Sequence, residues 1–317
     1  MCKDLPQFLY KYRSISDEIL YVRQEDGSHK FVDNGLDALS KGMVWFSHLD
    51  KLNDPYENVY DFDDSDYFRD LNQYLSTYPK PTTPQEIAKK ANVDAFIASQ
   101  RSAGKSDCEI ITALERLSSP SLKVQLVDIR RQIRSDKSNK TGILSLCKTN
   151  DNLLMWAYYA GEHKGFCLEF STTDQHAGNN ILCDGRYTFP VTYGKNYLTL
   201  KDVNPFYSST TPNPMTDMAE MAKSIEKVYC HKSLEWDREE EWRVVLDITG
   251  SKKKTDASGA LIPFPGKLTT VYFGCRATQM SIDAVKEAVK IGNYGYTTEF
   301  KKARLKTDSF GLDFDPV

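Results

Sequence analysis

The chain has 317 residues, of which 40% are hydrophobic and 27% charged, and its formal net charge is −3 at pH 7. This composition is typical of a folded protein that is long enough to bury a large core. The nearly balanced charge excludes a global nucleic-acid-binding footprint. No apolar run approaches the roughly 20 residues that a membrane-spanning helix needs, and the N-terminus lacks the apolar segment of a signal peptide. We therefore expect a cytoplasmic protein without membrane contact.

The first sixty residues predict a strand at 8–13, a short helix at 36–40 and a second strand at 43–47. In the first strand Lys11 and Arg13 share one face, which is typical either of a clamp for phosphate or carboxylate groups or of a solvated edge.

A turn is predicted directly after the second strand. Asn53 and Asp54 precede a proline, and both side chains can hydrogen-bond nearby backbone amides while the proline presets the bend. Glu57 follows and is expected to face a pocket. The alternative is a well-formed turn without further function.

Residues 62–138 differ from the rest of the chain. They are polar, highly charged and helical in their apolar spacing, for example at 84–99 and 121–135. Prolines and neighbouring threonines at 79–84 mark a break between helices. We predict a mainly helical insertion within a single domain that spans residues 1–317.

Short apolar runs dominate the rest of the chain. They predict strands at 142–147, 165–170, 190–193, 241–248, 269–273 and 296–300, and helices at 151–160, 217–231 and 281–290. No regular alternation of strand and helix is present. The order favours an α+β fold with a mixed, mostly antiparallel central sheet, flanking helices and the helical insertion.

The most informative segment is 239–246, which has the alternation of a strand. In an extended chain Glu239, Glu241 and Arg243 share one face, and Trp242 lies on the apolar face. Two carboxylates about 7 Å apart repel, so one has a raised pKa unless a cation lies nearby. Such a face suits a cleft that holds a sugar or a cationic group. The alternative is the charged outer face of an edge strand.

The helix predicted at 151–160 carries aromatic side chains at its centre. Trp156 and Tyr158 are expected either to pack in the core or to flank a planar ring in a site. His163 and Lys164 follow in a loop at the mouth of the next strand. This pair is expected to hold an anionic group, or else to be solvated.

Several familiar motifs do not occur in the sequence. It contains no G-x-G-x-x-G, no Walker loop, no G-x-S-x-G and no H-E-x-x-H. Rossmann dehydrogenases, P-loop enzymes, α/β-hydrolases and zincin proteases are therefore disfavoured.

The order of the motifs resembles a known family. The chain carries Lys-Tyr-Arg-Ser, Asn-Asp-Pro-Tyr-Glu, Met-Trp-x-x-Tyr, His-Lys-Gly-Phe-Cys-Leu-Glu-Phe, Trp-x-x-Glu-x-Glu-Trp-Arg and Val-Tyr-Phe-Gly in that order between residues 8 and 276. This resembles the domain-of-unknown-function family numbered 2971, which occurs in bacteria and phages, sometimes near defence genes. The resemblance implies no settled activity.

A looser resemblance is to ADP-ribosyltransferases. Their order of a basic residue, a polar or aromatic residue and a late Glu-x-Glu is matched by Arg13, then Ser47 or Tyr158, then Glu239 and Glu241. The resemblance implies NAD as substrate and no metal. It assigns Glu241 to the ribose and its oxocarbenium ion, Glu239 to the acceptor and Arg13 to the phosphates.

The other site residues are expected to converge with these on one cleft, because isolated charges are costly to bury unless they are paired. The cofactor-binding set is Arg13, Ser47, Trp156, Tyr158 and His163, and Asn53, Asp54, Glu57 and Arg243 support the catalytic carboxylates. In this hypothesis Glu241→Gln abolishes NAD turnover and leaves the melting temperature nearly unchanged.

Three functions stay open at this point. The first is an NAD-using effector of anti-phage defence or a toxin system, which modifies a protein or nucleic acid, or hydrolyses NAD. The second is a non-catalytic sensor that binds a defence-system partner or a phage trigger. The third is a metal-dependent nuclease built on Glu57, Glu239 and Glu241.

Overall fold

A computed structural model describes the greater part of the chain. The described residues are 5–15, 21–23, 29–54, 60–61, 75, 81–117, 140–174, 181–184, 187–196, 198–199, 229–248, 255–256 and 258–317. Their contacts divide the chain into two compact units. Unit 1 comprises residues 1–58, 136–196 and 217–317, and unit 2 comprises 59–135 and 197–216.

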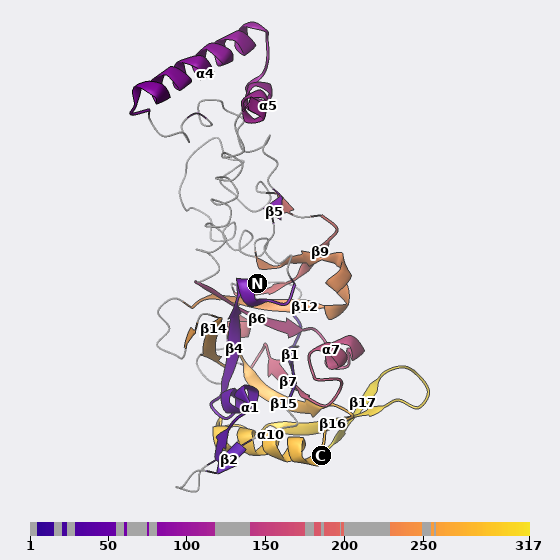
Figure 1. Cartoon of the computed structure of the whole chain (residues 1–317). Coiled ribbons are helices and arrows are strands. Elements are labelled where there is room, and N and C mark those ends of the chain that lie inside the picture. Colours follow the sequence, from indigo (N-terminus) through magenta and orange to yellow (C-terminus); the bar gives the residue numbers. More distant parts are fainter. Residues whose placement is uncertain are drawn as a thin grey trace. The chain divides into compact units, whose positions relative to one another are not determined.

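Unit 1 is built on an 11-stranded sheet (Figure 1). Its strands are β1 (Phe8–Arg13), β4 (Met43–His48), β6 (Thr141–Cys147), β7 (Phe166–Ser171), β8 (Thr188–Pro190), β12 (Glu241–Asp247), β13 (Thr255–Asp256), β14 (Gly259–Pro263), β15 (Lys267–Phe273), β16 (Glu299–Leu305) and β17 (Leu312–Pro316). Of the described pairings in this sheet, only that of β15 with β16 is parallel. The predicted α+β fold with a mostly antiparallel sheet is therefore confirmed.

The sheet forks at β6. The whole length of β6 pairs with β12, and β12 pairs in turn with β8. On its other edge the start of β6 pairs with β4, whereas its last residue, Cys147, pairs with Tyr10 of β1. From β1 the sheet continues through β7, β15, β16 and β17. The fork leaves a gap between β1 and β6, and the first residue of β12 lies in register with Cys147, next to that gap.

Helices cover both faces of this sheet. One face packs on α1 (Asn34–Leu39) and α10 (Gln279–Gly292) through a core that includes Leu36, Phe170 and Ile282. The other face packs on α7 (Leu153–Tyr158) through a smaller core with Tyr12 and Trp156. Side chains alternate between the faces along each strand, so β7, which is covered on both faces, is buried along its whole length and is mostly apolar.

The remaining elements of unit 1 are short. They are β2 (Tyr21–Arg23) paired with β3 (His29–Phe31), β9 (Thr192–Gly194) paired with β11 (His231–Ser233), and the 3₁₀ turns η1 (Leu49–Lys51), η2 (Ile181–Cys183) and η4 (Leu234–Glu239). Among the residues that the structure describes, no helix combines the length and apolar character required to cross a bilayer.

The described part of unit 2 contains two helices and a pair of two-residue strands. They are α4 (Pro84–Ser102), α5 (Asp107–Leu117), β5 (Tyr60–Asp61) and β10 (Leu198–Thr199). Thr83 and Glu86 form a reciprocal capping box that starts α4, with Pro84 at the first helical position. Ile97 of α4 packs with Ile110 of α5. The predicted helix at 84–99 is confirmed, whereas 121–135 lies outside the described residues. The insertion at 62–138 stays a prediction.

Several predicted boundaries need correction. The strand at 239–246 begins only at Glu241, because η4 occupies the residues before it. The strand at 296–300 is β16, which starts three residues later. The predicted strand at 190–193 is divided between β8 and β9. Most of the helix predicted at 217–231 lies outside the described residues, and its last residue, His231, begins β11.

Candidate functional site

Four charged side chains form one buried hydrogen-bonded network at the start of β12. Lys232 Nζ donates to Glu239 Oε2 at 2.7 Å and to Glu241 Oε2 at 3.2 Å. Arg243 donates to both oxygens of Glu241, from Nε at 2.9 Å and from Nη2 at 3.1 Å. Each of these side chains is less than a tenth exposed. We call Lys232, Glu239, Glu241 and Arg243 the charge network.

The turn before β12 brings these residues together. Ser233 caps η4 by accepting a hydrogen bond from the amide of Glu235. The turn ends at Glu240, whose φ of 45° is left-handed. Lys232 lies just before the turn and Glu239 at its end, so a lysine and a carboxylate seven residues apart meet. The indole ring of Trp236 lies 4.7 Å from Lys232 Nζ and adds a cation–π contact.

The network reaches the surface through Glu239. Tyr159 donates its hydroxyl hydrogen to Glu239 Oε1 at 2.5 Å, and the exposed Asn53 donates from Nδ2 to the Tyr159 oxygen at 2.6 Å. Burial and the neighbouring Glu239 raise the pKa of Tyr159, so its hydroxyl stays protonated and acts as a donor. A chain of polar groups therefore leads from a surface amide to a buried carboxylate.

Glu241 is held ionised by the cations of the charge network. Burial opposes the ionised form of Glu241, but Arg243 and Lys232 outweigh it and lower its pKa from 4.5 to about 2. Burial likewise opposes the charged form of Lys232, but Glu241 and Glu239 outweigh it and raise its pKa above the ordinary value. Glu241 is thus a fixed anion, held chiefly by Arg243 and Lys232.

Lys11 lies at the fork of the sheet, beside the network. Its Nζ donates to the carbonyl of Ser145 on β6 at 2.8 Å, across the gap where β1 diverges. Burial and the charge of Arg13 lower the pKa of Lys11 from 10.5 to about 8, although Glu241 acts in the opposite direction. The fork therefore places a fifth titratable group within electrostatic reach of Glu241.

Two of the predicted cofactor-binding residues lie away from the network. Arg13 is on the face of β1 that meets α1, where it faces Asp33 and Gly35. Ser47 on β4 is half-buried and lies in register with Ile143 of β6, whereas Glu241 lies in register with Cys147 of the same strand. Ile143 and Cys147 are four residues apart, which is roughly 13 Å along a strand. The structure does not bring these two side chains to Glu239.

The structure places the two aromatic residues of α7 in different environments. Trp156 is fully buried in the core, where it packs edge-on against Tyr12. Tyr158 is 71% exposed. The next residue, Tyr159, is the one that contacts Glu239. The two aromatic rings therefore do not flank a shared cleft, because the helix places them on different faces.

His163 lies in an unusual turn after α7. Gly161, Glu162 and His163 have φ values of 54°, 56° and 68°, so two residues with side chains adopt the left-handed conformation. The His163 ring stacks on Trp156 with 11° between the planes. Its Nδ1 is buried without a hydrogen-bond partner, and burial together with Arg276 lowers its pKa. The turn fixes a neutral imidazole close to a cation.

The predicted turn after β4 is only partly described. Asn53 ends the polar chain at the surface, whereas Asp54 is buried at 3% exposure. Glu57 lies outside the described residues. A nuclease would need carboxylates grouped around a metal, and within the described ranges no three His, Cys, Asp or Glu side chains are placed to hold one.

Three residues of the site were missed by sequence reasoning. They are Tyr159, Lys232 and Tyr193, whose hydroxyl accepts a hydrogen bond from the Glu241 amide at 2.8 Å. Lys11 was considered only together with Arg13, as a clamp for an anionic group. Lys232 lies in a strand of three residues, too short to show a period. For Tyr159 the available signal was the pair Tyr158-Tyr159 near a helix end.

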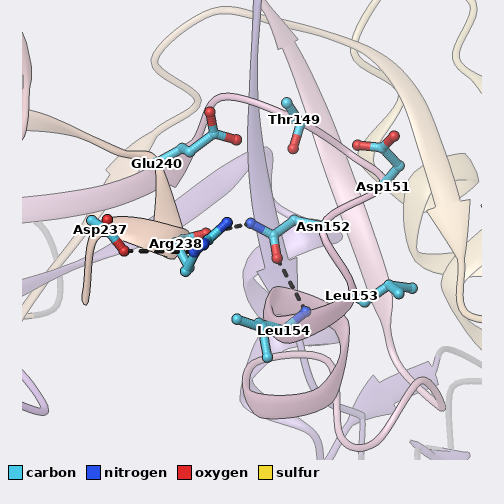
Figure 2. Close-up of a pocket in the computed structure, with 8 residues that line it drawn as sticks. All are labelled: Thr149, Asp151, Asn152, Leu153, Leu154, Asp237, Arg238 and Glu240. Carbon is cyan, nitrogen blue, oxygen red and sulfur yellow. Dashed lines mark hydrogen bonds and ion pairs between the residues drawn. The ribbon is translucent and has the colours of Figure 1, made fainter. Parts of the chain in front are cut away.

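An open hollow lies on the other side of the turn that carries Glu239 and Glu241. Its volume is about 560 Å³, and it is lined by Thr149, Asp151, Asn152, Leu153, Leu154, Asp237, Arg238 and Glu240. Figure 2 shows Asn152 between η4 and α7, where its side-chain amide donates to the carbonyl of Arg238 at 2.6 Å.

The part of the chain from α7 to β12 supplies the charge network and Tyr159. The family model described as "Protein of unknown function (DUF2971)" matches residues 155–244. This DUF2971 segment, less than a third of the chain, contains Tyr159 and the whole charge network, and is similar to that family. Lys11 and Asn53 lie outside it. Neither the curated proteins nor the solved structures gave a match, so the likeness to ADP-ribosyltransferases gains no support from the comparisons.

Proposed function

We propose that the protein binds NAD and breaks the bond between nicotinamide and ribose, passing ADP-ribose to a macromolecule or to water. The observation that carries this proposal is the charge network with its outlet to the surface through Glu239, Tyr159 and Asn53. Four charged side chains removed from water cost several kcal/mol each unless they are well paired, and replacement by apolar residues often stabilises a protein. A network that ends at a hydroxyl and an amide is therefore better explained by a binding site than by stability.

The proposed reaction needs a carboxylate beside the ribose. When the bond from ribose C1′ to the nicotinamide nitrogen breaks, its electron pair leaves with nicotinamide and the ribose gains positive charge. The acceptor oxygen or nitrogen then attacks C1′ and loses its proton to water. A fixed carboxylate stabilises the cation and can accept a hydrogen bond from a ribose hydroxyl.

We assign this part to Glu239 and a supporting part to Glu241. Both Glu241 oxygens are held by Arg243, and one is shared with Lys232. Glu239 is joined to the exposed Asn53 through the hydroxyl of Tyr159, which also orients the Glu239 carboxylate. These roles differ from those implied by the sequence resemblance, in which Glu241 meets the ribose.

The phosphates require cations that face the same side of the sheet. Arg13 faces α1 on the opposite side, beside Asp33. His163, in the turn after α7, lies near Arg276, which follows β15, and within the described residues His163 Nδ1 has no hydrogen-bond partner. We therefore assign the charge of the diphosphate to Arg276 in place of Arg13, with the neutral imidazole of His163 as a hydrogen-bonding partner.

Glu239→Gln is the decisive variant for this proposal. It keeps the size of the side chain and removes the charge, so release of nicotinamide from NAD should fall about 10²-fold or more. The matched control is Glu235→Gln, an exposed glutamate on the same turn, which should turn over NAD like the wild type. Nicotinamide is followed by chromatography, and ADP-ribose on protein or nucleic acid by mass spectrometry.

A non-catalytic sensor is the second candidate, because every carboxylate oxygen of Glu239 and Glu241 already accepts a hydrogen bond within the protein. A sensor would bind its ligand through Asn53 and Tyr159 and leave it unchanged. If NAD raises the melting temperature but no nicotinamide is released, the protein is a sensor and the proposed enzymatic function is wrong. If NAD has neither effect, the proposed use of NAD is refuted.

A further inference from the structure

The hollow between α7 and η4 is separate from the charge network. Glu240 lines the hollow, whereas its neighbours Glu239 and Glu241 are buried in the network. A volume of about 560 Å³ is enough for one or two side chains of a partner. The hollow is therefore a second surface, whose role does not depend on the use of NAD.

The α7 edge of the hollow is apolar and exposed. Leu153 and Leu154 line it and are 37% and 43% exposed. Tyr158, 71% exposed, lies four residues after Leu154 and therefore on the same side of the helix. Exposed apolar side chains that gather beside a hollow are typical of a surface that binds another molecule.

The surface is preformed. Asn152 caps α7 by accepting hydrogen bonds from the amides of Leu154 and Met155, and the same side chain donates to the carbonyl of Arg238. One residue therefore fixes the helix and joins it to η4 (Figure 2). A partner that docks here does not have to order either edge of the hollow.

The charge of the hollow selects the kind of partner. Asp151, Asp237 and Glu240 contribute carboxylates, against the single guanidinium of Arg238, whose Nε lies 3.9 Å from Asp237. Neither Asp151 nor Glu240 forms an ion pair with any residue in the described ranges. A basic side chain is the complement of this arrangement, and an acidic or uncharged one is not.

We propose that this surface docks a protein segment that presents a basic side chain flanked by apolar ones. The basic side chain enters the hollow and faces Asp237 and Glu240, while the apolar side chains cover Leu154 and Tyr158. Docking places the segment on the outer side of the turn that carries the charge network. The partner is thus a protein with an exposed basic and apolar segment.

The probe is a short capped peptide with a central arginine between two leucines, labelled with fluorescein. Its binding to the full chain is measured by fluorescence anisotropy at low salt. Two matched peptides replace the arginine by glutamate or both leucines by serine. We expect the arginine–leucine peptide to bind at least tenfold more tightly than either, a difference of about 1.4 kcal/mol.

Two variants and one control locate the binding on the protein. The charge variant is Asp237→Asn with Glu240→Gln, and the apolar variant is Leu154→Ala with Tyr158→Ala; each should weaken the peptide about tenfold or more. The control is Asp308→Asn with Phe310→Ala, an exposed acid and an exposed aromatic in the turn between β16 and β17, and it should bind like the wild type. All of these positions are exposed, so the variants should keep the wild-type melting temperature.

Three outcomes overturn the proposal. The first is equal binding of the glutamate peptide, and the second is wild-type affinity in both variants. The third is self-association of the wild type in sedimentation that the apolar variant abolishes, since the occupant is then a second copy of the chain. If none of the peptides binds, the proposal is overturned in the same way as by equal binding of the glutamate peptide. None of these results depends on nicotinamide release.

Discussion

Replacing Glu241 by glutamine should destabilise the protein strongly. The substitution keeps the shape of the side chain but leaves Lys232 and Arg243, both almost completely buried, with only Glu239 as a counter-charge. Removal of one partner from a buried ion pair typically costs 3–5 kcal/mol, because the remaining charge is left without compensation. The sequence alone had predicted a nearly unchanged melting temperature.

The pKa of Glu241 gives a second measure of the same effect. A fall from 4.5 to about 2 corresponds to roughly 3 kcal/mol of preference for the folded protein. Because the folded pKa is the lower one, this stabilisation is complete above about pH 5 and is lost as the pH falls towards 2. At roughly 2–4 °C per kcal/mol for a unit of this size, Glu241→Gln should melt about 6–12 °C below the wild type at pH 7.

Tryptophan fluorescence provides the assay. All four tryptophans lie in unit 1, so their emission follows the unit that holds the network. Melting curves of the wild type, Glu241→Gln and the exposed control Glu235→Gln are recorded from pH 7 down to pH 3. The gap between wild type and Glu241→Gln should shrink over this range. The reasoning is refuted if Glu241→Gln melts with the control at pH 7, or if its deficit is the same at pH 3.

Three other positions can each be tested by a single substitution. Tyr159→Phe removes the hydroxyl between the surface and Glu239 and should lower nicotinamide release at least tenfold. Its cost in folding free energy, measured by urea unfolding, should be only about 1 kcal/mol. Unchanged release would exclude Tyr159 from the site. Lys11 has a pKa of about 8 in the folded protein, below its ordinary 10.5, so the stability of the wild type should rise between about pH 8 and pH 10.5. The urea midpoints of Lys11→Met should not show this rise. If the wild type does not show it either, Lys11 does not have the lowered pKa. Gly274→Ala would place a methyl group against the carbonyl of His163 and should cost roughly 1–3 kcal/mol or more, checked by thermal melting; a wild-type melting temperature would mean that the turn moves freely.

The periodicity of the sequence was sufficient for most of the sheet. The strand predicted at 8–13 is observed with the same bounds, the strand predicted at 142–147 starts one residue earlier, and the strand predicted at 165–170 is displaced by one residue. These strands are covered on both faces or alternate regularly, so their apolar pattern reports their burial directly. The boundary at Glu241 was less certain, because η4 and a left-handed Glu240 interrupt the acidic run without any glycine or proline to mark them.

The residue types of the candidate site were also visible in the sequence, but their partners were not. The run of glutamates before Trp242 indicated carboxylates that need a cation, and Arg243 was recognised as one. Lys232 could not be recognised, since only the fold of η4 returns it to the same carboxylates. Tyr159 was missed for a similar reason. The side chain of Tyr158 is exposed to solvent, whereas that of the next residue, Tyr159, contacts Glu239, and the sequence does not show which of the two points towards the network.

The fold class, the central strands and the acidic segment that carries the candidate site could all be predicted from the sequence. Those properties are local, since each depends on the spacing of apolar and charged residues within one element. The packing of the strands and helices was needed to show that Arg13 faces α1, that Trp156 belongs to the core and that Lys11 occupies the fork between β1 and β6. Such choices depend on which strands become neighbours, and pairing between residues more than a hundred positions apart leaves no pattern in a single sequence.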